Sequence, residues 1–253
     1  MKQIQTTIAL TQLEIYPRCP AQYNYFQKRG GISTVQLLPK TKLFRDIACS
    51  TYLKAARNTR INPWRQMTAQ IDKFTFADLL PRSHPDYDSD VDTKFKLSLS
   101  RIDALKKHWY RPYFLAEGME GFSGLKTSLS IGGYNLVDTT DLVLFNEKDL
   151  ILCKFTNIET NQSMLYNNIR MRTQALMLSR NLGRLVTKIR SMSWPEDSEK
   201  ISVRDINIHN PVEFANKTEA VVSHIVGGIR KEIFYPSVSE QCFTCPFNNI
   251  CSF

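Results

Sequence analysis

The sequence predicts a single α/β domain spanning residues 1–253, and the order of three kinds of pattern carries this prediction. Apolar residues recur at helical spacing near the N-terminus. Short apolar and alternating runs follow between residues 113 and 156, and helical spacing returns from residue 164. Such an order is typical of a sheet flanked by helices. With 42% hydrophobic residues, the chain can bury a substantial core.

The N-terminal region is predicted to be mainly helical. Thr11-Gln12-Leu13-Glu14 has the form of a capping box, in which side chains satisfy the first free amides of a helix. Pro20 can begin a second helix, over residues 20–29, which Gly30-Gly31 would end. Residues 42–58 also show helical spacing. From residue 60 to residue 100 the spacing fails, which predicts an irregular insertion or a partner-binding lobe.

Residues 113–156 are predicted to form an antiparallel or mixed sheet, after a short helix over residues 101–110. Gly132-Gly133 and Asn146-Glu147-Lys148-Asp149 are typical of hairpin turns. The expected strands are the runs at residues 113–117, 125–131, 134–137, 141–145 and 150–155.

Residues 164–190 are predicted to form a long helix with an apolar face and a basic face. The basic face is a row at steps of three and four, formed by Arg170, Gln174, Met177, Asn181, Arg184 and Lys188. Such a row is either a solvated surface or a surface that follows a phosphate backbone. A strand over residues 201–208, with a bulge near Arg204-Asp205, and a helix over residues 213–229, closed by Gly227-Gly228, complete the domain.

Three cysteines lie close together near the C-terminus, at Cys242, Cys245 and Cys251. This spacing allows several thiolates to bind one zinc or iron centre. Cys19 is the best candidate for a fourth ligand, since Cys19-Pro20 repeats the Cys-Pro step at Cys245. In that case the centre joins the two ends of the chain. The alternative is that the cysteines are buried small apolar residues.

Charge and composition indicate the class of partner. Lys and Arg number 33 against 24 acids, a formal net charge of +9, which favours a polyanion such as DNA. No apolar run approaches the roughly 20 residues of a membrane span, so we expect no membrane association. Residues 1–7 lack an apolar signal core, and we therefore expect an intracellular location, cytoplasmic or nucleoid-associated.

A set of motifs matches the order of parts in a known family. The motifs are Tyr16-x-x-Cys19-Pro20, a hairpin with an acid, a strand ending in lysine, a helix with glutamine, and the terminal Cys-x-x-Cys-Pro-x-x-x-x-Cys. Together they resemble the RecB-like nucleases with an iron–sulfur cluster, which include CRISPR-associated and AddB-type exonucleases of the PD-(D/E)XK superfamily. The resemblance covers both ends and residues 113–253, and hardly touches residues 60–100.

The resemblance implies a PD-(D/E)XK nuclease-like sheet whose termini are joined at a cluster. It implies that residues 235–253 are a cluster-binding tail, and that Cys49 and Cys153 lie outside the cluster. A [4Fe–4S] cluster is expected, with zinc as the alternative. The ligands would be Cys19, Cys242, Cys245 and Cys251.

Within the catalytic motifs the resemblance is partial. Asp141 matches the position of the family's first acid, which is a ligand for Mg²⁺ or Mn²⁺. Lys154 matches the position of the motif lysine, and Gln174 matches the position of the helical glutamine. The second acid is expected one residue before the lysine, where this chain has Cys153. The helix over 42–58 lacks the family's early histidine. Asp138 could join the site only in a different register, since it lies three residues from Asp141 and faces the other side of an ideal strand.

These residues lead to three hypotheses. The first is a non-catalytic or weakly catalytic DNA-binding protein, a subunit of a DNA-processing or transcription assembly, with Arg170, Arg184 and Lys188 on phosphates. The second is an active Mg²⁺- or Mn²⁺-dependent DNA exonuclease. The third is a zinc-stapled module whose positive charge serves protein contacts.

Overall fold

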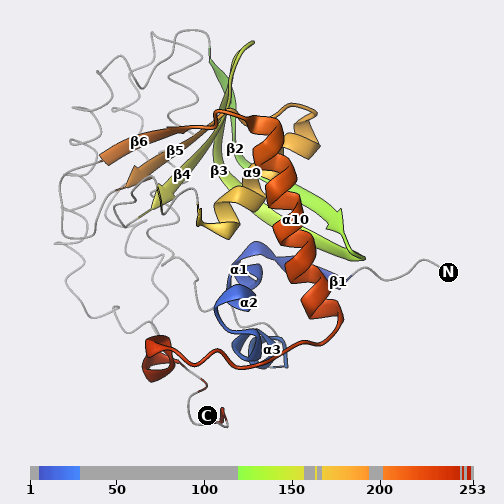
Figure 1. Cartoon of the computed structure of the whole chain (residues 1–253). Helices are drawn as coiled ribbons and strands as arrows, with labels where there is room; N and C mark the ends of the chain where they lie inside the picture. Colours follow the sequence, from blue (N-terminus) through green and yellow to red (C-terminus); the bar gives the residue numbers. More distant parts are fainter. Residues whose placement is uncertain are drawn as a thin grey trace, which may run out of the picture.

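The computed structural model describes residues 6–28, 119–156, 163, 167–193, 202–245, 247 and 250–251 (Figure 1). Cys49, the helices expected over 42–58 and 101–110, and the insertion expected over 60–100 lie outside the described residues. No helix among those described is long and apolar enough to cross a membrane.

A six-stranded mixed sheet forms the centre of the described part of the chain. Its strands are β1 (Thr6–Ala9), β2 (Glu120–Ile131), β3 (Tyr134–Phe145), β4 (Leu150–Thr156), β5 (Lys188–Ser193) and β6 (Ser202–Asn207). The helices are α1 (Leu10–Leu13), α2 (Ile15–Arg18), α3 (Pro20–Lys28), α9 (Ile169–Leu182) and α10 (Pro211–Arg230), with the 3₁₀ helix η1 (Glu240–Thr244) in the tail. The mixed α/β class predicted from the sequence is therefore confirmed.

Strand β3 changes its pairing partner along one of its two edges, and the candidate site lies at this change. On one side β3 pairs with β2 along its whole length, from Glu120↔Phe145 to Ile131↔Tyr134. On the other side its first residues pair with β1, up to Ala9↔Val137, and its last residues pair with β4, from Leu142↔Cys153. Residues 138–141 therefore lie in a fork between β1 and β4, where the registers give β3 no partner on that side among the described strands.

Helices α9 and α10 cover the face of the sheet on which two apolar clusters form (Figure 1). One cluster packs β4, β5 and β6 against α9 and the start of α10. The other packs β1, the start of β3 and helices α1 to α3 against α9 and the end of α10. Burial of each large aliphatic side chain stabilises the fold by roughly 1.5–3 kcal/mol. The second cluster thereby holds the N-terminal helices beside the fork.

Several predicted boundaries were wrong, for physical reasons that the structure shows. The long helix ends at Leu182, because Gly183 takes a left-handed conformation with φ of 63°, and residues 188–193 form β5. β5 and β1 were not predicted. The expected bulge at Arg204-Asp205 is absent, since β5 and β6 pair in a continuous register. Helix α10 runs through Gly227-Gly228 to Arg230.

At the N-terminus one expectation is confirmed and one is wrong. Pro20 is the first residue of α3. Thr11 is inside α1 and does not cap it, because the chain enters the helix directly from β1; the backbone amide of Ala9 donates to the side-chain oxygen of Gln12 at 3.3 Å. Glu14 thus follows α1, at the junction with α2.

Candidate functional site

Asp138 and Asp141 lie in the fork of the sheet and contact residues of α9 and β4. The register with β2 passes over Gly124 and Asp141, and Gly124 has a φ of 64°, a conformation that favours glycine. The two strands are thus irregular beside the acids. Lys154 of β4 has its Nζ 3.3 Å from Oδ2 of Asp141, which is almost fully buried. The structure therefore joins the predicted first acid and the predicted lysine.

Helix α9 binds Asp138 with two side chains one turn apart. Nε of Arg170 donates to Oδ2 of Asp138 at 3.2 Å, and Nη2 donates to Oδ1 at 3.3 Å. Nε2 of Gln174 donates to Oδ2 at 2.7 Å. Burial lowers the pKa of Arg170, but the negative charges of Asp138, Glu14 and Asp141 outweigh burial and raise it above its ordinary value. Arg170 is therefore a fixed cation among three carboxylates.

Glu14 is the functional candidate that the sequence did not reveal. It sits at the α1–α2 junction beside the fork, and burial raises the pKa of its carboxyl above the ordinary value of 4.5. The positive charges of Arg170, Arg18 and Lys154 act in the opposite direction and are outweighed. The sequence presented Glu14 as the last residue of a capping box, and only the turn from β1 into α1 brings it to the fork.

Some buried polar atoms beside the fork have no hydrogen-bond partner among the described residues. Oε1 of Gln174 is one, although Nε2 of the same amide donates to Asp138. Oγ1 of Thr140 and Oγ1 of Thr127 are two more, and both residues lie on the strands that frame the acids. Buried polar groups usually have partners, so such atoms are positions where a water or a ligand can bind.

Cys153 does not occupy the place of a metal ligand, which corrects the expectation from the resemblance. Successive residues of a strand point to opposite faces, so Cys153 points away from the face that carries Lys154. It is fully buried, and burial raises the pKa of its thiol to about 12. The position that shares the face of Lys154 is Leu152, whose side chain is buried in the apolar cluster.

The three predicted phosphate-binding residues lie on separate elements rather than on one helix face. Arg170 is in α9 and binds Asp138. Arg184 follows α9, and its Nη1 donates to the carbonyl oxygen of Asn146. Lys188 begins β5, with its Nζ 2.7 Å from Oδ2 of Asp149. Each of the three side chains already has an acceptor within the protein.

The four cysteines of the predicted cluster line one small cavity of about 30 Å³, between α3 and the tail. The sulfur of Cys19 accepts from the backbone amides of Gln22 at 3.4 Å and Ser237 at 3.5 Å. The sulfur of Cys242 accepts from the amide of Ser239 at 3.4 Å. Within the described residues, no three His, Cys, Asp or Glu side chains are arranged closely enough to hold a metal ion, here or at the fork.

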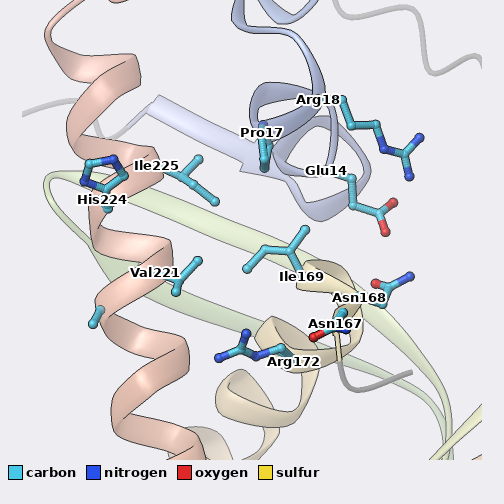
Figure 2. A pocket seen from close by; sticks show the side chains of 11 residues that line it. Glu14, Pro17, Arg18, Asn167, Asn168, Ile169, Arg172, Val221, His224 and Ile225 are labelled. Atoms are coloured by element: carbon cyan, nitrogen blue, oxygen red, sulfur yellow. The ribbon is translucent and has the colours of Figure 1, made fainter. Parts of the chain in front are cut away.

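A larger cavity of about 670 Å³ opens beside the fork, between α10, the α1–α2 junction and the start of α9 (Figure 2). Its apolar lining comes from Pro17, Ile169, Ala220, Val221 and Ile225. Its polar lining comes from Glu14, Arg18, Asn167, Asn168, Arg172 and His224. Glu14 lines the cavity, and its negative charge also acts on Arg170 together with the charges of Asp138 and Asp141, so the cavity lies beside the fork.

Comparisons with known proteins give a likeness of fold. No family model matches the chain, and no curated protein matches it in sequence. A crystal structure of a "Putative exonuclease" from Eubacterium rectale has a TM-score of 0.54 and 10% identity, over 98% of this chain and 90% of that one. The crystal structure of a protein named SSO0001 has a TM-score of 0.42 and 14% identity, over 100% and 89% of the two chains. The chain therefore has a nuclease-like mixed α/β fold.

Proposed function

We propose that this chain is a nucleic-acid-binding protein that uses a nuclease-like fold and hydrolyses phosphodiester bonds weakly or not at all. One observation carries the proposal: the carboxylates of the fork are held by the protein's own cations, Arg170 on Asp138 and Lys154 on Asp141. Mg²⁺ and Mn²⁺ need accessible carboxylate oxygens, and hydrolysis at such a site needs the metal to activate water.

The charge of the fork supports weak metal binding. Two of its three carboxylates, those of Asp138 and Asp141, are in direct contact with cations, Arg170 and Lys154. A divalent ion would have to displace both Arg170 and Gln174 to reach Oδ2 of Asp138. When bound, the ion would supply Lewis-acid activation of water; the chain's own residues already neutralise the charge that would attract it.

Binding of nucleic acid is supported by the net charge of +9 and by the basic side chains around the fork and the cavity. The proposal keeps Arg170, Arg184 and Lys188 as phosphate contacts. Each would exchange a protein acceptor for a phosphate oxygen, so their contribution is smaller than that of three unpaired cations. Affinity should fall steeply as salt concentration rises, and the Arg170→Gln/Arg184→Gln/Lys188→Gln variant should bind more weakly than the parent at the same salt.

A cleavage assay with Mg²⁺ and with Mn²⁺, on labelled single- and double-stranded DNA, separates binding from catalysis. We expect little cleavage by the parent protein. One observation favours the second candidate, an active metal-dependent exonuclease: the negative charges of Asp138, Glu14 and Asp141 all act on Arg170 at the fork, although as placed the three carboxylates are not close enough to hold one metal ion. Robust parental cleavage that Asp141→Ala abolishes would establish that candidate and overturn the weakly catalytic proposal.

We propose further that Cys19, Cys242, Cys245 and Cys251 hold a [4Fe–4S] cluster. Two observations support the fit: the four thiols line one cavity, and backbone amides donate to the sulfurs of Cys19 and Cys242, as they do to sulfurs in iron–sulfur sites. The thiols would have to move closer together to bind one centre, since no three of the described cysteines are close enough as placed. A [4Fe–4S] cluster would here join α3 to the tail. Anaerobic purification should give brown protein with four irons per chain, and Cys19→Ser should lose them.

Metal analysis of the purified protein also tests the remaining alternative, a zinc-stapled interaction module. Colourless protein with one zinc per chain would replace the iron–sulfur assignment and leave the four-cysteine joint intact. If such protein also bound neither DNA nor RNA, the zinc-stapled interaction module would be the better description. The wider proposal places the protein as a subunit of a DNA-processing or transcription assembly; co-purification of a tagged chain with nucleic-acid enzymes tests that role.

A further inference from the structure

We propose that the 670 Å³ cavity beside the fork binds one unpaired nucleotide of a nucleic-acid strand. This inference rests on the proposed function. The volume lies within the range of small-molecule sites, roughly 300–1,000 Å³, and therefore accommodates a nucleobase with its sugar. Glu14 lines the cavity and its carboxyl is influenced by the charges of Arg170 and Lys154, so the cavity lies beside the fork.

The walls of the cavity suit a flat ring. Ile169 projects from the first turn of α9, and Val221 and Ile225 project from neighbouring positions on α10 (Figure 2). Ile225 is buried and Val221 is 40% exposed, so the wall extends from the core to the surface. A nucleobase between these aliphatic side chains removes apolar surface from water on both of its faces. Aliphatic walls accept all four bases, which predicts little sequence preference.

The polar lining suits the edge of a base and its phosphate. Arg172 is held in place, since its Nε donates to Oγ1 of Thr218 at 3.3 Å and its guanidinium lies 5.7 Å from the centroid of Phe214. The oxygen of Asn168 accepts from the backbone amide of Met171, so a ligand would meet its amide nitrogen. With Arg18 and His224 also in the lining, the basic groups outnumber the single carboxylate, Glu14.

The arrangement of the walls argues for an unpaired nucleotide rather than a duplex, because the cavity is a partly open hollow with apolar side chains on α9 and on α10. Its walls come from three separate parts of the chain, the α1–α2 junction, the start of α9 and α10. A base can enter only if it is unstacked, because a base pair within a duplex presents edges and backbone but not its faces. A peptide would bury the same apolar walls, but the basic rim favours a phosphate-bearing ligand.

The test compares two exposed valines of α10. Val221 lines the cavity, whereas Val212 is 55% exposed at the start of the same helix and lies outside the lining. Val221→Glu and Val212→Glu change the net charge equally, so their effects on long-range attraction match. Binding is measured by fluorescence anisotropy on the full chain, with a labelled 20-nucleotide oligo-dT and a labelled blunt hairpin duplex at the same salt.

We expect Val221→Glu to weaken oligo-dT binding at least about fivefold, because loss of about 40 Å² of apolar burial costs about 1 kcal/mol, which is about fivefold in affinity. We expect less than about twofold change on the duplex, and less than about twofold for Val212→Glu on either probe. His224→Glu, also exposed on α10, should repeat the effect of Val221→Glu and guards against a local folding defect.

Three outcomes overturn the inference, and they differ in what they say of the proposed function. Equal effects of Val221→Glu and Val212→Glu on oligo-dT would exclude the cavity and leave nucleic-acid binding intact. Equal weakening of both probes by Val221→Glu would show a general electrostatic surface rather than a site for an unpaired base. Absence of salt-dependent binding by the parent to either probe would overturn the proposed function and this inference together.

Discussion

Removal of Arg170 is the perturbation whose cost the structure defines most closely. The side chains of Arg170 and Asp138 are 22% and 12% exposed, and two charge-assisted hydrogen bonds join them. Breaking a fully buried pair by removing one partner costs about 3–5 kcal/mol, and partial exposure reduces the cost. For Arg170→Met we therefore expect a loss of about 2–3 kcal/mol in the free energy of unfolding.

Removal of Arg170 and removal of the charge of Asp138 should differ in their effect on the free energy of unfolding. Without Arg170, the largely buried carboxylate of Asp138 keeps two neutral donors, the side-chain amide of Gln174 and the backbone amide of Thr139, but no cation. Without the charge of Asp138, in Asp138→Asn, Arg170 still has the negative charges of Glu14 and Asp141 nearby. Arg170→Met should therefore cost more than Asp138→Asn, and the double variant should cost less than the two together, by about 1–2 kcal/mol.

Urea unfolding followed by circular dichroism measures these differences, and the same helix supplies a matched control. Arg180 of α9 pairs with Glu219 of α10 at 2.5 Å, but the two side chains are 56% and 39% exposed, so Arg180→Met should cost less than about 1 kcal/mol. In thermal unfolding, the loss expected for Arg170→Met corresponds to roughly 4–12 °C. If Arg170→Met cost no more than Arg180→Met, the interpretation of Arg170 as a structural cation of the fork would be refuted.

The residues of the fork and of β4 lead to further predictions. Arg170→Gln removes a cation that lies near three carboxylates, so the variant should bind Mn²⁺ at least about tenfold more tightly than the parent does. Calorimetry or electron paramagnetic resonance measures this affinity, and an unchanged affinity would show that Arg170 does not compete with the metal ion. Burial raises the pKa of Glu14, so ionisation of its carboxyl destabilises the folded state as pH rises above 4.5. Glu14→Gln should therefore increase the free energy of unfolding at pH 7 but not near pH 4. Urea titrations at both pH values measure this, and a variant that is more stable only near pH 4 would contradict the prediction. Cys153, with its thiol pKa raised to about 12, should react with iodoacetamide at pH 8 roughly a hundredfold more slowly than a free cysteine, by mass spectrometry of the native protein; rapid labelling would show that β4 is not the buried strand described.

The sequence predicted the fold class because each element carried a local signal. Pro20 begins α3 as expected, and Gly132-Gly133 forms the turn between β2 and β3. What it could not predict were features decided by tertiary pairing. Residues 184–190 keep helical spacing, yet β5 forms there because it pairs with β4 and β6 in the core of the sheet. Gly183 was the one local signal that the helix ends earlier.

The candidate site was predictable only in part, for a similar reason. Asp141, Lys154 and Gln174 could be identified from motifs, and the fork brings all three together. Asp138 was expected to join them only in a different register, because residues three apart face opposite sides of a regular strand. The strands are irregular at this point, with Gly124 left-handed beside Asp141, and a glycine between Ser123 and Leu125 does not by itself predict this irregularity from the sequence.

The fork itself connects the fold to the choice between binding and catalysis. Because β3 changes partner from β1 to β4, its residues 138–141 stay open to side chains from α9 and from the α1–α2 junction. Any carboxylate placed there is buried and needs a positive partner, since an unpaired charge in such a place is costly. In this chain Arg170 and Lys154 supply that partner. Under the proposed function these two cations occupy the carboxylates to which a divalent ion would otherwise bind, and they cannot activate water as a metal ion does. The proposed balance between binding and catalysis therefore depends on which cation fills the fork.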